Sequence, residues 1–243
     1  MAKPRTPDGP PPPVAVQKLR IQYARRGRLR YSSTRDFGRA LERALRRSGV
    51  PMAYSAGFHP HPKISYANGA PTGAASEAEY FEISVIEPVD PDAVAAALDS
   101  ALPEGLDIVS VIDAQPGALA DRLQVSRWRL EFPGVAPDEL ERVIEAFLEH
   151  EHVEVQRMFK RGMKTFDARG PVLTAHTGAG EDGCAILTMV VRHTTPAVRP
   201  DDVLSAITAA TSFAPPRSPI ATRLAQGIWS SETESVADPL AID

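Results

Sequence analysis

Residues 57–83 read GFHPHPKISYANGAPTGAASEAEYFEI, and the rest of the chain is organised around this stretch. Its first half brings together two histidines, a lysine and several turn-forming residues, which predicts an irregular loop. From Tyr80 onward, large apolar side chains alternate with polar ones, which predicts a strand. Binding and catalytic groups concentrate in loops held by a rigid scaffold. We therefore expect a functional loop here, with the candidate residues His59, His61, Asn68, Glu77 and Glu79.

The residues before this loop predict a helix. Ser33 is a good N-cap residue, and Asp36 occupies the capping-box position three residues later. Gly49 and Pro51 are typical helix stop signals. Between these ends, apolar residues recur at the spacing of one helix face, namely Phe37, Ala40, Leu41, Ala44 and Leu45.

Positive charge is concentrated around this helix. Residues 17–63 contain twelve Lys or Arg and two acids, a local balance of +10, although the whole chain carries −4. This asymmetry favours a basic binding face, because guanidinium groups bind phosphates and neighbouring aromatic rings stack on unpaired bases. An ordinary solvated surface is the alternative. The residues that we expect to bind nucleic acid are Arg28, Arg30, Arg35, Arg39, Arg43, Lys63 and Tyr66, with Arg161 and Lys164 in a second basic patch.

The order of expected elements repeats along the chain. The first half contains, in this order, a strand at residues 14–24, the helix, two strands, a helix opened by Asp90 and Pro91, and a strand at residues 106–112. In the second half, strands at residues 123–132, 153–159, 184–192 and 220–229 alternate with helices at residues 137–149 and 200–211, and we expect 153–159 to pair with 184–192 across a long insert.

This repeated order predicts an α+β protein of two tandem ferredoxin-like (βαββαβ) units with antiparallel sheets. We expect a disordered proline-rich tail at residues 1–13, a first unit with the basic helix and the His-Pro-His loop at 14–116, a second unit at 121–229, and a loose acidic tail at 230–243.

The pair His59-Pro60-His61 has three possible roles. Residues i and i+2 of an extended segment point the same way, so both imidazoles can converge on a metal ion if further ligands approach. A histidine can also act as a general acid or base near neutral pH. Hydrogen bonds that shape the loop are the third role, which we favour; we accordingly expect no catalytic residue, no bound metal and no other cofactor.

Composition excludes several classes of protein. No run of 18 apolar residues exists, and the N-terminus lacks the apolar segment of a signal peptide, so we expect a cytoplasmic protein without membrane association. The chain has a single cysteine, Cys184, which excludes an intramolecular disulfide and an iron–sulfur cluster ligated by cysteines of this chain alone.

Residues 30–66, RYSSTRDFGRALERALRRSGVPMAYSAGFHPHPKISY, together with EAEYFEI at 77–83, resemble the radical-SAM-linked (radical-SAM-associated) family, whose members contain a domain of unknown function. The resemblance is strong over residues 18–114 and fainter to residue 227. It implies association in trans with a radical-SAM protein, in RNA modification or ribosome-related work. Any radical chemistry must then come from that partner, because this chain lacks the three-cysteine motif.

Three functions follow from these observations. The first is a non-catalytic accessory module that recognises RNA, either tRNA or rRNA, for a radical-SAM partner. The second is an RNA-processing or RNA-modifying enzyme that uses His59 or His61, an analogy at the level of fold alone. The third is a module that binds only protein.

Overall fold

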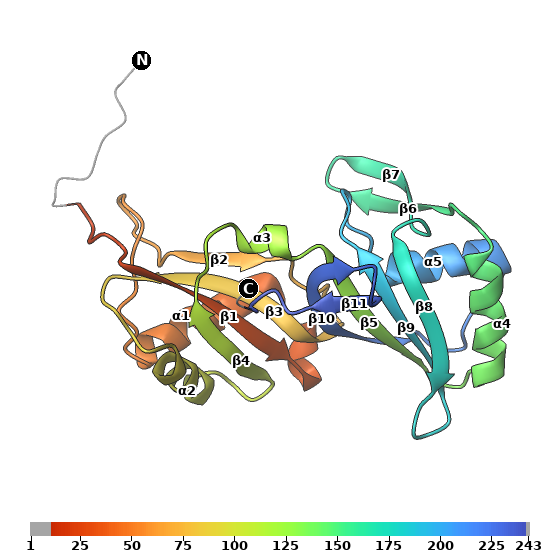
Figure 1. The fold of residues 1–243 in the computed structure, drawn as a ribbon, viewed down its shortest axis with the longest axis horizontal. Coiled ribbons are helices and arrows are strands. Elements are labelled where there is room, and N and C mark those ends of the chain that lie inside the picture. Colours follow the sequence, from red (N-terminus) through yellow and green to blue (C-terminus); the bar gives the residue numbers. More distant parts are fainter. Residues whose placement is uncertain (1–10, 242–243) are drawn as a thin grey trace, which may run out of the picture. The chain divides into compact units, whose positions relative to one another are not determined.

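The computed structural model describes residues 11–241 as a mixed α+β protein with mostly antiparallel strands and five α-helices. Two compact units divide the described chain: unit 1 contains residues 11–72 and Ala78–Leu119, and unit 2 contains Gly73–Glu77 and Ala120–Ala241. Figure 1 follows the chain through their elements. Among the described residues, no helix is long and apolar enough to cross a membrane.

Unit 1 holds a sheet with the strand order β4-β1-β3-β2. Both β1 with β4 and β2 with β3 pair antiparallel. Two helices connect the strands, α1 between β1 and β2 and α2 between β3 and β4. The elements are β1 (Gln17–Arg25), the 3-10 helix η1 (Gly27–Tyr31), α1 (Thr34–Arg47), β2 (Ile64–Ala67), β3 (Ala75–Val85), α2 (Pro91–Ala101) and β4 (Leu106–Asp113).

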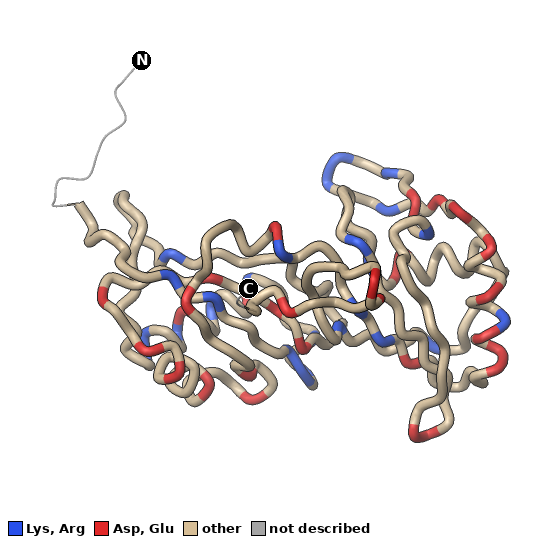
Figure 2. The backbone as a smooth tube through the Cα atoms, in the orientation of Figure 1, with Lys and Arg blue, Asp and Glu red and all other residues tan. Residues whose placement is uncertain are grey.

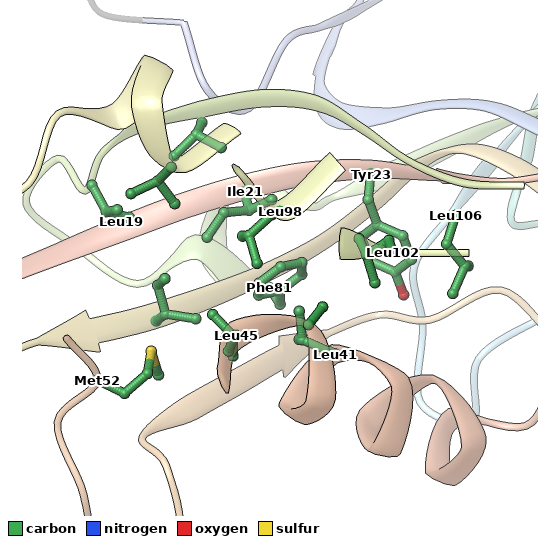
Figure 3. Packing of buried hydrophobic residues seen from close by; sticks show 14 of the residues in the cluster. Leu19, Ile21, Tyr23, Leu41, Leu45, Met52, Phe81, Leu98, Leu102 and Leu106 are labelled. Atoms are coloured by element: carbon green, nitrogen blue, oxygen red, sulfur yellow. The ribbon is translucent and has the colours of Figure 1, made fainter. Parts of the chain in front are cut away.

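The core of unit 1 lies between one face of this sheet and the two helices. Tyr23 of β1 stacks on Phe37 of α1 with ring centroids 4.2 Å apart, and Phe81 of β3 meets both rings edge-on. Figure 3 shows further apolar side chains of the sheet and helices packed around Phe81. Each large apolar side chain removed from water contributes about 1.5–3 kcal/mol, so this cluster holds the two helices on the sheet.

The prediction for the first helix is confirmed. The Ser33 side chain accepts a hydrogen bond from the Asp36 N–H, and the Asp36 side chain accepts one from the Ser33 N–H, which completes a capping box. Asp90 caps α2, with Pro91 at its first turn, as the sequence also predicts. Between these helices, β3 begins at Ala75 and not at Tyr80, so Glu77 and Glu79 lie in a strand and not in the loop.

Unit 2 holds strands in the order β10-β5-β9-β8, all paired antiparallel, and β11 pairs with β10. In addition, Ala75 and Ser76 at the start of β3 pair parallel with Thr222 and Arg223. Helix α4 packs on β8, β9 and α5. The elements are α3 (Leu119–Arg122, whose first residue belongs to unit 1), β5 (Val125–Phe132), α4 (Pro137–Leu148), β6 (Glu154–Phe159), β7 (Gly162–Asp167), β8 (Val172–Ala179), β9 (Ala185–Arg192), α5 (Pro200–Thr211), β10 (Ile220–Ser230) and β11 (Ser235–Ala237).

One predicted strand pairing in this unit is wrong. The strand expected at 153–159 does not pair with 184–192; as β6 it forms a separate two-stranded hairpin with β7, closed between Phe159 and Gly162. The partner of β9 is β8, which lies inside the region that we expected to be an insert. Gly162 has a φ of +108°, which suits glycine at the turn and lets the chain reverse immediately after β6.

The predictions for the N-terminal and C-terminal tails have different outcomes. Residues 1–10 of the proline-rich tail expected at 1–13 lie outside the described residues. The acidic tail at 230–243 is not loose over its described part, because Ser235–Ala237 forms β11 on β10. Arg122 donates hydrogen bonds to the carbonyl oxygens of Pro239 and Ala241, and Leu240 is buried. Backbone pairing and one buried leucine therefore attach a segment whose composition alone favours disorder.

Candidate nucleic-acid interface

An arginine row runs along the solvent side of α1. Arg35, Arg39 and Arg43 follow one another at a spacing of four residues, which places them on one helix face. All three are exposed, whereas the opposite face is buried in the core of unit 1. Among the described residues, none of the three makes a salt bridge or a hydrogen bond through its guanidinium group. We call Arg35, Arg39 and Arg43 the arginine row.

The other two arginines of α1 already have contacts. Arg46 lies 3.9 Å from the carboxylate of Glu42, and its Nε donates a 3.2 Å hydrogen bond to the backbone carbonyl oxygen of Glu42. Arg47 donates to the carbonyl oxygen of Ala101 in α2. The helix therefore offers three arginines, and not five, that make neither a salt bridge nor a guanidinium hydrogen bond in the described chain.

The arginines around η1 also divide into partnered and unpartnered groups. Arg28 is exposed and beside an open hollow between η1 and the start of β4. Arg30 donates a 2.8 Å hydrogen bond to the Tyr31 hydroxyl and lies over that ring. Arg26 forms a 2.7 Å ion pair with Asp107. Of the predicted residues here, Arg28 is the more available for a phosphate, and Arg30 presents a cation already stacked on an exposed aromatic ring.

Tyr66 lies on β2, beside α1. Its ring meets Phe37 edge-on at 5.9 Å and lies 6.4 Å from Phe81, so part of the ring belongs to the core. Burial, with a smaller contribution from the Glu42 carboxylate, raises the pKa of Tyr66 to about 12. Lys63, just before β2, is exposed, and its backbone N–H donates to Ala53. A neutral phenol can donate a hydrogen bond at neutral pH, and Tyr66 remains 42% exposed although one side of its ring contacts the core.

His59 and His61 lie in the exposed loop that precedes β2. Neither imidazole has a hydrogen-bond partner in the described residues. No group of three or more His, Cys, Asp or Glu residues suited to a metal ion occurs in the described part of the chain. His61 lines a small pocket against α1, together with Tyr54 and Glu42. Sequence reasoning missed Glu42 as a site residue, because it stands out there only as the single acid among the arginines of the helix.

Glu79 is a buried support of the loop that begins at the exposed Asn68. The Glu79 carboxylate, only 1% exposed, accepts a 3.0 Å hydrogen bond from the Ala70 N–H. Arg25 also holds this loop, because its guanidinium group donates hydrogen bonds of 3.0 Å to the carbonyl oxygens of Ala70 and Pro71. Asn68 has a φ of +39°, a turn conformation that asparagine tolerates. Glu79 therefore stabilises the loop and is not available to a ligand.

The second basic patch lies on the β6–β7 hairpin of unit 2. Figure 2 shows lysine and arginine positions gathered at the tip of this hairpin. Arg161 is exposed at the turn, and Lys164 lies 5.3 Å above the Phe159 ring. Arg157 lies over Phe159 and Phe166, and it also donates to the buried carboxylate of Asp202.

Glu77, the last predicted loop residue, belongs to unit 2 and is half-buried in β3.

Unit 2 also contains a serine–histidine pair that the sequence analysis missed. The Ser126 hydroxyl lies 2.7 Å from His193 Nε2, and His193 Nδ1 lies 2.7 Å from the Leu123 carbonyl oxygen. Burial lowers the pKa of His193, which favours the neutral imidazole. Ser126 is only 2% exposed, so a substrate cannot reach its hydroxyl in this conformation. The pair joins the start of β5 to the chain after β9.

Comparisons with solved structures give no functional lead. The encapsulated DyP-type peroxidase from Mycobacterium smegmatis is 10% identical over 89% of this chain and 94% of its own, with a TM-score of 0.20. DyPB from Rhodococcus jostii RHA1 is 12% identical over 88% of this chain and 91% of its own, also with a TM-score of 0.20. Likeness at this level supports no statement about fold or chemistry.

No curated protein matches the chain. One bacterial family does, over residues 18–200, a range that includes the arginine row, the His-Pro-His loop and the β6–β7 hairpin. Because this match covers well over half of the chain, the protein belongs to the family described as uncharacterized protein conserved in bacteria (DUF2344).

Proposed function

We propose that this protein is a non-catalytic accessory subunit that binds RNA through the arginine row and presents it to a radical-SAM protein in the cytoplasm. The observation that carries the proposal is that Arg35, Arg39 and Arg43 are exposed and that none of them makes a salt bridge or a guanidinium hydrogen bond with a described residue. Exposed helix faces normally mix both charges, so three unpaired cations in one row favour a polyanionic ligand.

The spacing of the arginine row suits a nucleic-acid strand. A helix rises about 1.5 Å per residue, so the row extends over roughly 12 Å. Guanidinium groups bind phosphate oxygens in bidentate fashion, and each neutralised phosphate releases counterions. Unit 1 also carries exposed aromatic residues, namely Tyr31, Tyr54, Phe58 and Tyr66. Such rings stack on unpaired bases, which favours RNA with single-stranded regions.

Two further parts of the proposal rest on topology and on resemblance. The strand orders β4-β1-β3-β2 and β10-β5-β9-β8, each with two connecting helices, support a ferredoxin-like unit in each half, the second enlarged by the β6–β7 hairpin. The radical-SAM partner rests on the resemblance of residues 30–66 and 77–83 to the radical-SAM-linked family. The single cysteine of the chain is consistent with a cluster supplied by another protein.

The test is RNA binding as a function of salt, measured by fluorescence anisotropy with a labelled RNA that contains a stem and an unpaired loop. The variant is Arg35→Gln, Arg39→Gln and Arg43→Gln together, because glutamine keeps helix propensity. The matched control replaces three exposed arginines elsewhere, Arg142, Arg192 and Arg217, by glutamine.

We expect the row variant to bind at least about tenfold more weakly and to lose about 2 units from the slope of log K against log salt, because three phosphate contacts are lost. The control should keep the slope of the wild type. Equal slopes for all three proteins would refute the arginine row as the RNA contact. If no RNA binds to the wild type, the basic face would instead serve a protein partner, and recovery of RNA crosslinked to the tagged protein in cells would fail as well.

A further inference from the structure

A small pocket lies between the C-terminal half of α1 and the chain that follows it. Its volume is about 170 Å³. Leu45 and Met52, both labelled in Figure 3, contribute apolar surface from the edge of the core. Glu42, Arg46, Tyr54, Pro60, His61 and Pro62 also line the pocket.

Backbone hydrogen bonds hold the outer wall of this pocket. Met52 and Val85 form one antiparallel bridge, and Tyr54 and Pro62 form another. The Ser55 N–H donates a 2.8 Å hydrogen bond to the His61 carbonyl oxygen, and the Ser55 hydroxyl accepts one of 3.0 Å from the His61 N–H. Because two prolines also restrict this segment, the wall is formed before any ligand arrives.

The helix side of the pocket carries one acceptor and one donor group. Glu42 and Arg46 are four residues apart on α1, with Nη2 of Arg46 3.9 Å from Oε2 of Glu42. This distance is too long for a hydrogen bond, and the Glu42 carboxylate accepts none from any described residue. A ligand that enters the pocket therefore meets a carboxylate that accepts no hydrogen bond from a described residue, beside the guanidinium group with which it is loosely ion-paired.

The size and the walls indicate the kind of ligand. Pockets for drug-sized molecules usually measure at least about 300 Å³, so this one suits a single flat ring system. Tyr54 and His61 are exposed, and their rings offer faces for stacking. An unpaired base placed between aromatic side chains, with its Watson–Crick edge read by hydrogen bonds, is the common mode of sequence-specific RNA recognition.

We propose that this pocket binds one unpaired guanine of the RNA, an inference that rests on the proposed RNA binding. Guanine presents two adjacent donors, N1–H and the 2-amino group, followed by the O6 acceptor. The donors match the two oxygens of Glu42, and O6 matches the guanidinium of Arg46. Adenine, cytosine and uracil each lack the pair of neighbouring donors, so the carboxylate discriminates against them.

The experiment compares three labelled single-stranded RNAs that differ at one position: a uridine 11-mer, the same strand with a central guanosine, and the same strand with a central inosine. Inosine lacks only the 2-amino group. The variant is Glu42→Gln, which keeps the helix and the size of the side chain but turns one carboxylate oxygen into a donor. The matched control is Glu141→Gln on the exposed face of α4. The measured quantity is the ratio of dissociation constants, because removal of an acid near arginines changes overall affinity.

We expect the wild type and Glu141→Gln to prefer guanosine over uridine and over inosine by about tenfold, the discrimination typical of one bidentate contact. Both ratios should fall to about one in Glu42→Gln. Equal affinity of the wild type for the three strands, or a preference that survives in Glu42→Gln, would overturn the guanine pocket. Base-independent binding that is lost in the arginine-row variant would overturn the pocket alone, whereas no binding of any strand would overturn the proposed function with it.

Discussion

The hydroxyl oxygen of Tyr66 lies 3.3 Å from the point where a Cβ atom on Gly38 would stand. Glycine is a poor helix former, and at this position its missing side chain lets the phenol lie directly on α1. Tyr66 thereby lies against Phe37 and within electrostatic reach of Glu42, and it connects the sheet to α1. Several consequences of such contacts can be measured.

We expect Tyr66 to ionise near pH 12. Burial is the larger cause and the Glu42 charge the smaller, so Glu42→Gln should lower the pKa of Tyr66 while leaving it above 10. Because the raised pKa belongs to the folded state, the stability contribution of Tyr66 is complete below pH 10 and is lost as the pH rises through 12. The ultraviolet absorbance of phenolate during alkaline titration, compared between wild type and Tyr66→Phe, measures this; a difference between the two titrations that appears near pH 10 and not near pH 12 would contradict it.

Glu79→Ala should lower the free energy of unfolding by about 1–3 kcal/mol, because the buried Ala70 N–H loses its acceptor. Glu79→Gln, which retains one acceptor oxygen, should cost less. The exposed Glu87→Ala in the same unit serves as the control. Urea unfolding followed by circular dichroism measures all three variants. A loss for Glu79→Ala no larger than for Glu87→Ala would show that the carboxylate does not hold this loop.

Ser33→Ala should destabilise α1 by about 1 kcal/mol at neutral pH, because the N-cap hydroxyl no longer accepts from the Asp36 N–H. Ser100→Ala on the exposed face of α2 should have no such cost. Hydrogen bonds from Ser33 lower the pKa of Asp36, so the stability that Asp36 contributes is present above its unfolded value near 3.8 and is lost as the pH falls through the lower folded value. Thermal unfolding between pH 7 and pH 2 should therefore show the difference between Ser33→Ala and wild type shrinking in acid.

Arg157→Ala should loosen the β6–β7 hairpin without unfolding unit 2. An isolated two-stranded hairpin is marginal in water, and Arg157 attaches this one to Asp202 and to the Ala197 carbonyl oxygen. We expect the local opening free energy to fall by about 2 kcal/mol, typical of hydrogen bonds to charged groups. Amide hydrogen exchange in β6 and β7, together with tryptic cleavage at Lys160 and Arg161, reports this opening. Gln156→Ala, an exposed neighbour, should leave both readouts unchanged.

Signals within a short stretch of sequence predict those helices that are determined by interactions between neighbouring residues. The Ser33 cap and the apolar spacing from Phe37 onward are sufficient for α1, and Asp90 and Pro91 are sufficient for α2. The β6–β7 hairpin was missed because its turn, Lys160 and Arg161 followed by Gly162, lacks the Asn-Gly or Asp-Gly pair that is the strongest short-range hairpin signal. The two large apolar residues of β7, Met163 and Phe166, are three positions apart, so the period of two that indicates a strand is missing.

The candidate site was predictable in its charges but not in its geometry. The exposure of Arg35, Arg39 and Arg43 follows from helical periodicity alone. In contrast, the burial of Glu79 depends on a loop nine residues away in the chain. The pocket at Glu42 depends on the bridge between Tyr54 and Pro62. Contacts of this kind come from tertiary packing, which residue spacing does not encode.

The start of β3 has a consequence for synthesis of the protein on the ribosome. Ala75 and Ser76 belong to unit 2, but their partners on β10 are made much later, and Ser76 and Arg223 are 147 residues apart. During translation these two residues emerge long before the strand that pairs with them, so unit 2 cannot complete its sheet until the chain is almost finished. Loop closure over such a separation slows folding. A fragment that begins at residue 120 would lack this strand segment, and expression of unit 2 by itself should therefore include residues 73–77.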